Sequence, residues 1–330
     1  MMTAANPPIR IATRGSALAL AQAQMVMARC QAAFPALEFQ LKVIKTTGDK
    51  LQTAALAHEG RNLPKGLFTK ELEVALLNHE ADLAVHSLKD LPTELPTGLR
   101  LGAVTERADV RDVLLYRDAQ AAGAEGRGGG FRAPVRIKDL PAGTVVATSS
   151  TRRKAQLLAI NPGLKTPDIR GNVLTRMQKL ASQRSLDATI LAFAGMSRLR
   201  YAVSPAGAIE GQDVPAGLRA TILELDEMLP CVGQGAIGLE IRDNDEPLAA
   251  ICQQLNHEPT AQCVTAERAF LAAMGGGCQS PVAAYAWVAG ETLEISAVSF
   301  AAHPVRRARA SRPRNQAVEL GQWVAAQLKK

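Results

Sequence analysis

The chain has 330 residues, enough for two or three domains that each bury a core of their own. Apolar residues make up 47% and charged residues 21%, and no uninterrupted apolar stretch approaches the roughly 20 residues of a membrane span, so the composition indicates a globular protein that is not inserted in a membrane. The net charge of +7 favours anionic partners, while an aromatic content of 4% argues against a stacking surface for nucleic acid.

Cysteine usage and the N-terminal segment indicate a reducing compartment. The five cysteines are odd in number and show no paired spacing, which argues against a disulfide framework and against a zinc site. Residues 1–8 lack the charged-then-apolar pattern of a secretory signal. We therefore expect a cytoplasmic protein, and no motif argues for anything beyond a monomer.

The first part of the chain alternates predicted strands and helices. Residues 10–13 predict a short strand, 17–33 an alanine-rich helix and 39–46 an alternating strand. Residues 66–79 carry apolar side chains at helical spacing, and 82–86 form a brief apolar strand.

The same pattern returns after residues 119–134, a Gly- and Ala-rich stretch that we interpret as a surface insertion. Strands are predicted at 144–148, at a segment ending at Ile169 and at 188–194, with helices at 152–159 and 173–183. This alternation predicts largely parallel sheets with helices on both faces.

The last part of the chain predicts a small α+β domain. It contains a helix at 260–273, strand-like stretches at 282–288 and 293–300, and a final helix at 317–329. The arginines between 306 and 314 are interpreted as a solvated surface near the C-terminus.

Cations and hydroxyl groups recur just after the predicted strands, where each strand joins the next helix. They are Arg14 with Ser16, residues 86–90, residues 149–153, and residues 170–172 followed by Arg176. Ligands of open α/β sheets bind beyond the carboxyl ends of the strands, so these side chains are expected to line one crevice. Helix N-termini favour anions and arginine binds carboxylates through two hydrogen bonds, so the crevice is predicted to bind an anion.

Taken singly, each of these motifs is better explained by a structural role. Ser149 and Ser150 are suited to cap a helix, and His86, at the end of an apolar strand, is suited to a structural hydrogen bond. Several cationic strand ends in one fold still favour an anion site, because like charges gathered without a ligand repel one another. One acid, Asp90, stands among these bases, and it can hold a developing cation, exchange a proton or pair with Lys89.

Cys278 lies in the glycine-rich stretch Gly275-Gly276-Gly277-Cys278-Gln279-Ser280-Pro281. The glycines permit positive φ and remove bulk beside the thiol, which suits a covalent bond to a closely approaching group. The alternative is a small residue in a tight turn. Three further observations concern other loops. Residues 53–60 are a candidate mobile lid before Lys65, and residues 232–236 suit a crossover between domains. No dinucleotide-binding or P-loop motif occurs in the sequence.

These motifs occur together in one known family. The chain resembles porphobilinogen deaminase (hydroxymethylbilane synthase) from about Arg10 to Pro281, in the order of that family. The matching segments are 11–14 (IATR), 65–72 (KGLFTKEL), 86–92 (HSLKDLP), 148–153 (TSSTRR), 170–176 (RGNVLTR), 232–236 (VGQGA) and 276–279 (GGCQ).

The resemblance implies that Cys278 carries a dipyrromethane cofactor through a thioether. Four porphobilinogens then add head to tail, each with loss of ammonia, and water releases hydroxymethylbilane. Asp90 would be the catalytic residue, stabilising positive charge on pyrrole nitrogens and assisting proton transfer as the azafulvene forms, and Lys65 with the loop before it would gate the cleft. The implied cofactor- and substrate-binding residues are Arg14, Ser16, Lys65, Ser87, Lys89, Thr148, Ser149, Ser150, Arg152, Arg153, Arg170, Gly171, Asn172, Arg176, Arg198 and Gln234.

The implied fold has two periplasmic-binding-protein-like α/β domains, doubly wound with mixed sheets, and a small α+β C-terminal domain. The expected boundaries are 1–105 with 236–253 for domain 1, 106–235 for domain 2 and 254–330 for domain 3. The sequence departs from the family pattern in a longer lid before Lys65, in Thr151, in Gly275 and in the insertion at 119–134.

Two rival functions are weaker. A small-anion solute-binding protein of the same two-domain fold predicts a secretion signal and needs no thiol. A hydrolase with a cysteine nucleophile needs a base beside Cys278, and none of the five histidines is recognisably placed for it. A nucleic-acid binder ranks last.

Overall fold

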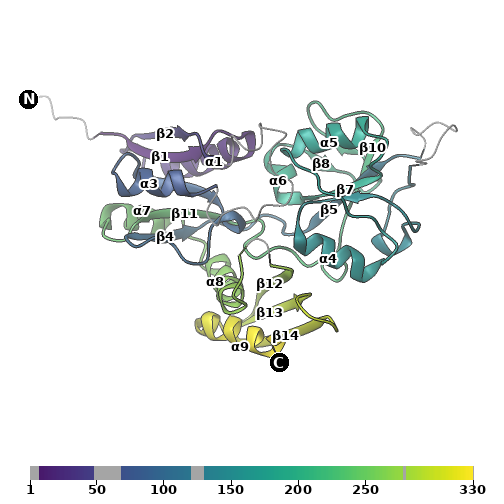
Figure 1. The fold of residues 1–330 in the computed structure, drawn as a ribbon. Coiled ribbons are helices and arrows are strands. Elements are labelled where there is room, and N and C mark those ends of the chain that lie inside the picture. Colours follow the sequence, from purple (N-terminus) through teal and green to yellow (C-terminus); the bar gives the residue numbers. More distant parts are fainter. Residues whose placement is uncertain (1–6, 48–67, 120–129, 278–279, 330) are drawn as a thin grey trace, which may run out of the picture.

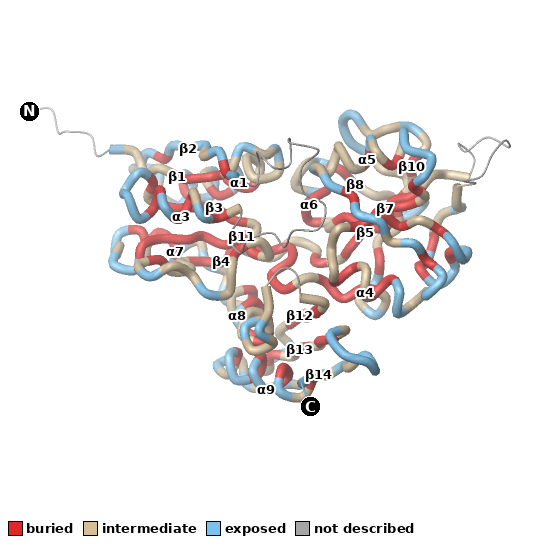
Figure 2. Tube along the Cα trace, viewed as in Figure 1, coloured by how far each residue is buried: buried red, intermediate tan, exposed pale blue. Residues whose placement is uncertain are grey.

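The computed structural model describes residues 7–47, 68–119, 130–277 and 280–329. Within these residues the chain forms a five-stranded, a four-stranded and a three-stranded sheet, each covered by helices, and a two-stranded ribbon (Figure 1). Figure 2 shows the buried residues gathered along the strands and the inward helix faces of each part. None of the described helices is long and apolar enough to cross a membrane.

The five-stranded sheet has helices on both faces. Its strand order is β2-β1-β3-β11-β4. Cys30 and Ile251 pack one face into a core, and Leu72 and Leu76 pack the other. The elements of this part are β1 (Ile9–Arg14), α1 (Ala17–Ala33), β2 (Phe39–Ile44), α3 (Lys70–Leu77), β3 (Leu83–Ser87), the 3-10 turn η1 (Leu88–Asp90), β4 (Leu99–Val104), β11 (Ile237–Arg242) and α7 (Glu246–Leu255).

The four-stranded sheet is also packed on both faces, by Met177 and Leu180 on one and by Leu157 on the other. Its strand order is β10-β5-β7-β6. The elements are β5 (Asp112–Arg117), η2 (Ile137–Asp139), β6 (Val146–Ala147), α4 (Thr151–Ile160), α5 (Val173–Ser182), β7 (Ala188–Ala192), α6 (Phe193–Arg198), the ribbon strands β8 (Ala202–Val203) and β9 (Ile209–Glu210), and β10 (Leu218–Ile222).

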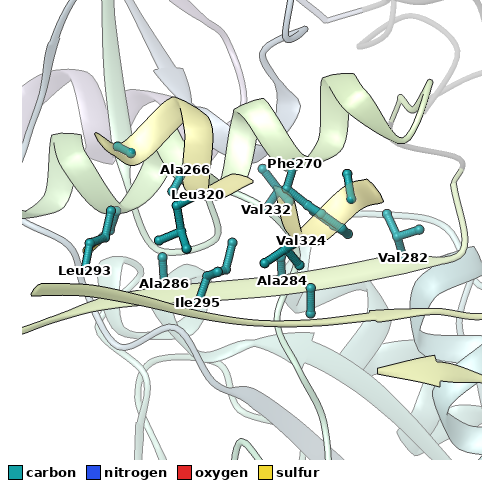
Figure 3. Close-up of a cluster of buried hydrophobic side chains, with 14 of the residues drawn as sticks. Val232, Ala266, Phe270, Val282, Ala284, Ala286, Leu293, Ile295, Leu320 and Val324 are labelled. Carbon is teal, nitrogen blue, oxygen red and sulfur yellow. The ribbon is translucent and has the colours of Figure 1, made fainter. Parts of the chain in front are cut away.

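The three-stranded sheet is antiparallel throughout and packs against two helices. Its elements are α8 (Glu258–Ala273), β12 (Val282–Ala289), β13 (Thr292–Ser299), β14 (Arg306–Pro313), η3 (Arg314–Gln316) and α9 (Ala317–Lys329). Phe270 and Val324 meet Ile295 in its core, which Val232 joins from the connection between β10 and β11 (Figure 3). Gly321 lets the two helices touch, because a Cβ there would lie 2.1 Å from the carbonyl oxygen of Ala266.

The expected fold class is confirmed, since two mixed α/β sheets are followed by a small α+β part. Largely parallel sheets were a wrong prediction. Strands β1–β2, β1–β3 and β6–β7 pair in parallel, whereas β3–β11, β4–β11, β5–β7 and β5–β10 are antiparallel. The physical reason is that β5 and β11 enter from the other sheet without the crossover helix that a parallel connection needs.

One further local prediction is corrected, and one strand was not predicted. No strand ends at Ile169, because the only pairing between 161 and 170 is an isolated bridge at Lys165 and the prolines of this stretch lack an N–H for a ladder. The arginine-rich stretch forms a strand that was not predicted, β14, in which Ala308 and Ala310 face the core while Arg307 and Arg309 are exposed, in agreement with the expected solvated surface.

Two connections join the large sheets, at residues 105–111 between β4 and β5 and at 223–236 between β10 and β11. The expected boundaries near 105 and 235 fall in these connections, and the domain division stays a prediction. Helix α7 ends at Leu255, two residues beyond the expected boundary at 253.

Candidate active site

The turn after β3 presents Lys89 and Asp90. Leu88 and Leu91 on either side are 1% and 4% exposed, so they anchor the turn in the core and leave the two charged residues partly exposed between them. The Leu88 N–H donates to the carbonyl of Ala236 at 3.0 Å, which ties the turn to the connection that enters β11. Hydrophobic anchoring on both sides therefore fixes where the charged pair lies.

Side chains beneath and beside this turn have structural partners. The Ser87 hydroxyl donates to Gln22 Oε1 of α1 at 2.9 Å. His86 is buried, and its Nε2 lies 2.9 Å from Glu240 Oε2 of β11. The expectation that His86 is a structural histidine is thus confirmed.

A second acid, Asp112, is the centre of a buried polar cluster at the start of β5. Its Oδ2 accepts from Arg152 Nη2 at 2.8 Å, and its Oδ1 accepts from Arg153 Nη2 and Gln234 Nε2, each at 2.8 Å. Burial alone would raise the pKa of Asp112, but the guanidinium groups of Arg152 and Arg153 hold it well below its usual range. The prediction that Asp90 is the one acid among these bases is therefore wrong.

Arg152 and Arg153 use their terminal nitrogens in hydrogen bonds within the protein, and their assignment as binding residues stays a prediction. Besides Asp112, Arg152 Nη1 donates to the Leu229 carbonyl and Arg153 Nη1 to the Ile190 carbonyl. The Nε atoms of both residues, and that of Arg198, are buried without a hydrogen-bond partner among the described residues.

Partial burial destabilises the charged forms of three cations, Lys89, Arg176 and Arg198. Burial lowers the pKa of Lys89. The negative charge of Asp90 raises this pKa, and the positive charge of Arg153 lowers it. Burial and the charge of Arg153 lower the pKa of Arg176 to about 10, and burial and Arg29 lower that of Arg198 to about 10. Cations that burial destabilises in this way are stabilised by an anionic ligand.

The predicted hydroxyl and amide residues have local roles in the structure. Ser16, Ser150 and Asn172 cap α1, α4 and α5 by accepting from the backbone N–H groups of Ala19, Arg153 and Thr175. The Ser149 hydroxyl donates to the Ile169 carbonyl at 2.9 Å, and Thr148 accepts from the N–H of Ser150. Gly171 has a φ of +121°, which only glycine adopts readily, and its carbonyl accepts from Arg176 Nε at 2.9 Å.

The remaining predicted residues contact other groups, are exposed or lie outside the described residues. The Arg14 guanidinium lies 4.3 Å from the centre of the Phe68 ring, Arg198 donates to the Gly235 carbonyl at 2.6 Å, and Arg170 is exposed. Lys65, the candidate lid at 53–60 and Cys278 lie outside the described residues.

Sequence reasoning missed two carboxylates that organise this region. Asp112 opens a strand whose next four residues, 113–116, are uncharged and buried, and an acid in that position is a signal that a buried partner exists. Glu267 of α8 pairs with Arg107 at 2.7 and 3.0 Å and accepts from the N–H groups of Gly233 and Ala286. It therefore joins both connections to the three-stranded sheet.

We expect Asp112→Asn to destabilise the protein by about 3–5 kcal/mol at neutral pH, because it leaves two buried guanidinium groups without their carboxylate. A carboxyl with a depressed pKa in the folded state stabilises the fold above its ordinary pKa of 3.8 and loses this contribution as the pH falls toward the folded value. The difference in the free energy of unfolding between wild type and Asp112→Asn should therefore become smaller below about pH 4. Urea unfolding at several pH values measures it.

Asp168→Asn is the matched control for this experiment. Asp168 pairs with Lys154, the residue after Arg153, but its side chain is 59% exposed. We expect Asp168→Asn to change the free energy of unfolding by less than about 1 kcal/mol. An equal loss in both variants would contradict the role assigned to Asp112.

Comparison with known proteins identifies the family. Residues 9–250 match the sequence model described as "Porphobilinogen deaminase, dipyromethane cofactor binding domain", and residues 261–330 match "Porphobilinogen deaminase, C-terminal domain". The chain belongs to the porphobilinogen deaminase family.

Relatives in this family cover most of the chain. The porphobilinogen deaminase of Chloroherpeton thalassium is 42% identical over 87% of this chain and 81% of its own, and that of Synechococcus elongatus is 42% identical over 100% and 94%. Among solved structures, the regulatory domain of an OxyR2 variant from Vibrio vulnificus aligns with 77% of this chain and 98% of its own at a TM-score of 0.39 and 14% identity.

The residues of the site fit the cofactor of this family. Dipyrromethane carries carboxylate side chains on both pyrroles, as the family resemblance implies, so it is a polyanion. Burial lowers the pKa of Lys89, Arg176 and Arg198, which a bound anion would offset, and the Nε atoms of Arg152 and Arg153 are buried donors without an acceptor among the described residues.

Proposed function

We propose that this protein is a transferase that joins four porphobilinogens head to tail on a covalent dipyrromethane primer and releases hydroxymethylbilane. In each addition the aminomethyl group of one porphobilinogen loses ammonia, a carbon–carbon bond forms to the free α-carbon of the chain, and that carbon loses a proton. One water enters when the tetrapyrrole is released. The dipyrromethane supplies the α-carbon to which the first unit is joined.

The observation that carries this proposal is the gathering of buried and partly buried cations around Asp90. The charge of Arg153 lowers the pKa of both Lys89 and Arg176, while Asp90 and Asp112 raise the pKa of Lys89. The positive charge left over suits a ligand with several carboxylates, which a growing pyrrole chain is. A site for a small monoanion needs no such accumulation.

Asp90 is proposed as the catalytic residue. Its carboxylate accompanies Lys89 on the turn η1, where it can stabilise positive charge on a pyrrole nitrogen and hold the proton released there. Lys89, Arg152, Arg153, Arg176 and Arg198 bind carboxylate side chains in this proposal.

Ser16, Ser150 and Asn172 act in this proposal through the helix starts that they cap. The backbone N–H groups at these starts favour anions.

Cys278 is proposed as the attachment residue, and the other thiols support this assignment. Burial raises the pKa of Cys30 and Cys263 to about 11 and that of Cys252 to about 12, and burial also raises that of Cys231. A thiol held protonated at neutral pH is a poor nucleophile. These four cysteines are therefore unsuited to carry the primer.

The test is turnover of porphobilinogen by the purified protein. We expect four ammonia molecules for each tetrapyrrole released, measured by an ammonia assay and by mass spectrometry of the product. Binding of porphobilinogen without release of ammonia would contradict the proposal and favour the small-anion solute-binding alternative.

A further inference from the structure

The helix α8 packs directly beneath the turn that presents Asp90. Val264 of α8 is 1% exposed and shares a buried cluster with Leu88 and Leu91, the two residues that anchor this turn. Figure 1 shows α8 below β4 and β11, between the five-stranded and three-stranded sheets. Helix α8, which also packs against the three-stranded sheet, therefore supports the turn that carries Lys89 and Asp90.

Arg268, one helical turn beyond Val264, binds the backbone that follows Asp90. Its Nη1 donates to the Leu91 carbonyl at 3.1 Å, and its Nη2 donates to the carbonyls of Pro92 and Thr93 at 2.6 and 3.2 Å. A guanidinium group has its donors in a rigid planar fork. Because the guanidinium group of Arg268 is rigid, it fixes the positions of the carbonyls of residues 91–93 relative to one another.

This arrangement is not explained by ion pairing. None of the ion pairs among the described residues involves Arg268. Burial lowers the pKa of Arg268, and the charge of Glu240, the partner of His86 under the same turn, raises it. Apolar groups of similar volume often replace buried charges without loss of stability, so the placement of Arg268 indicates a geometric role.

We propose that Arg268 is a positioning residue for Asp90, which acts by holding residues 91–93 and so fixing the direction of the carboxylate on the preceding turn. The proposal rests on the proposed function, in which Asp90 acts on the pyrrole chain. It also assigns to α8, which leads in sequence toward Cys278, a direct part in holding the turn that carries Asp90.

Arg268→Gln tests this proposal. Because a displacement of about 1 Å at a catalytic group costs on the order of 100-fold in rate, we expect kcat to fall about 10- to 100-fold. KM should stay within about threefold, because the cations that bind substrate carboxylates are unchanged. Intact mass should show the same two-pyrrole adduct as the wild type. Wild-type kcat in this variant, or a lost adduct that accounts for the lost activity, would overturn the proposal.

Arg314→Gln is the matched control, because the Nε of Arg314 donates to Gln262 of the same helix at 2.9 Å without contacting residues 91–93. We expect wild-type kcat, and an equal loss in this control would overturn the proposal by indicating a general loosening of α8. Arg268→Lys, which keeps three donors on its ammonium, should have a kcat between those of wild type and Arg268→Gln.

If Arg268→Gln fails to fold, Arg268→Lys decides, with a reduced kcat at unchanged KM supporting the proposal and wild-type kcat overturning it. A wild type that does not turn over porphobilinogen would contradict the proposed function itself.

Discussion

Asp90→Asn should lower kcat for porphobilinogen by about 100- to 10,000-fold while leaving the fold intact. Asparagine keeps the shape of the side chain but carries no negative charge and cannot take up a proton at neutral pH. Leu88 and Leu91 still anchor the turn, so the variant should unfold at the wild-type temperature. Steady-state kinetics and thermal unfolding measure both expectations.

The chain offers a matched control in η2, which repeats the local chemistry of η1. Residues 137–139 (Ile-Lys-Asp) form a 3-10 turn as residues 88–90 (Leu-Lys-Asp) do, but Asp139 is exposed on the four-stranded sheet. Asp139→Asn should leave kcat unchanged. A wild-type rate in Asp90→Asn would remove Asp90 from the mechanism.

Cys278→Ala should abolish activity and remove the covalent adduct altogether. Alanine cannot form a thioether, and burial raises the pKa of the thiols of Cys30, Cys231, Cys252 and Cys263, so none of these four cysteines is suited to replace it. Intact-mass measurement should show two pyrrole units above the sequence mass in the wild type and the bare sequence mass in the variant.

Cys263→Ala is the control in the same part of the chain, because Cys263 lies on α8 and is buried. This variant should keep the adduct. An active wild type with the mass of the bare sequence, or an adduct retained in Cys278→Ala, would refute the attachment at Cys278.

The local structure of the chain was largely predictable. The helices at 17–33 and 317–329 have the expected bounds, because alanine-rich and amphipathic periodicity is a property of neighbouring residues. The direction of the strands was not predictable in the same way. Strands β5 and β11 come from the opposite sheet, and whether such a strand runs parallel depends on the path of the chain between domains.

The candidate site was likewise predictable from the sequence only in part. Its cations at the strand ends were visible in the sequence, but their partners were not, since Arg152 meets Asp112 across 40 residues and Arg268 meets Leu91 across 177. The motif around Arg152 and Arg153 therefore gave no sign that their terminal nitrogens are held inside the protein.

The sequence by itself determined the family, the helices and the collection of charged residues after the strands. Only the tertiary structure decided that Asp112 neutralises part of that charge, which side chains are left with unpartnered donors, and that α8 supports the Asp90 turn. The physical reason is that motifs record residue types, whereas burial and long-range pairing decide how much of each charge is available to a ligand.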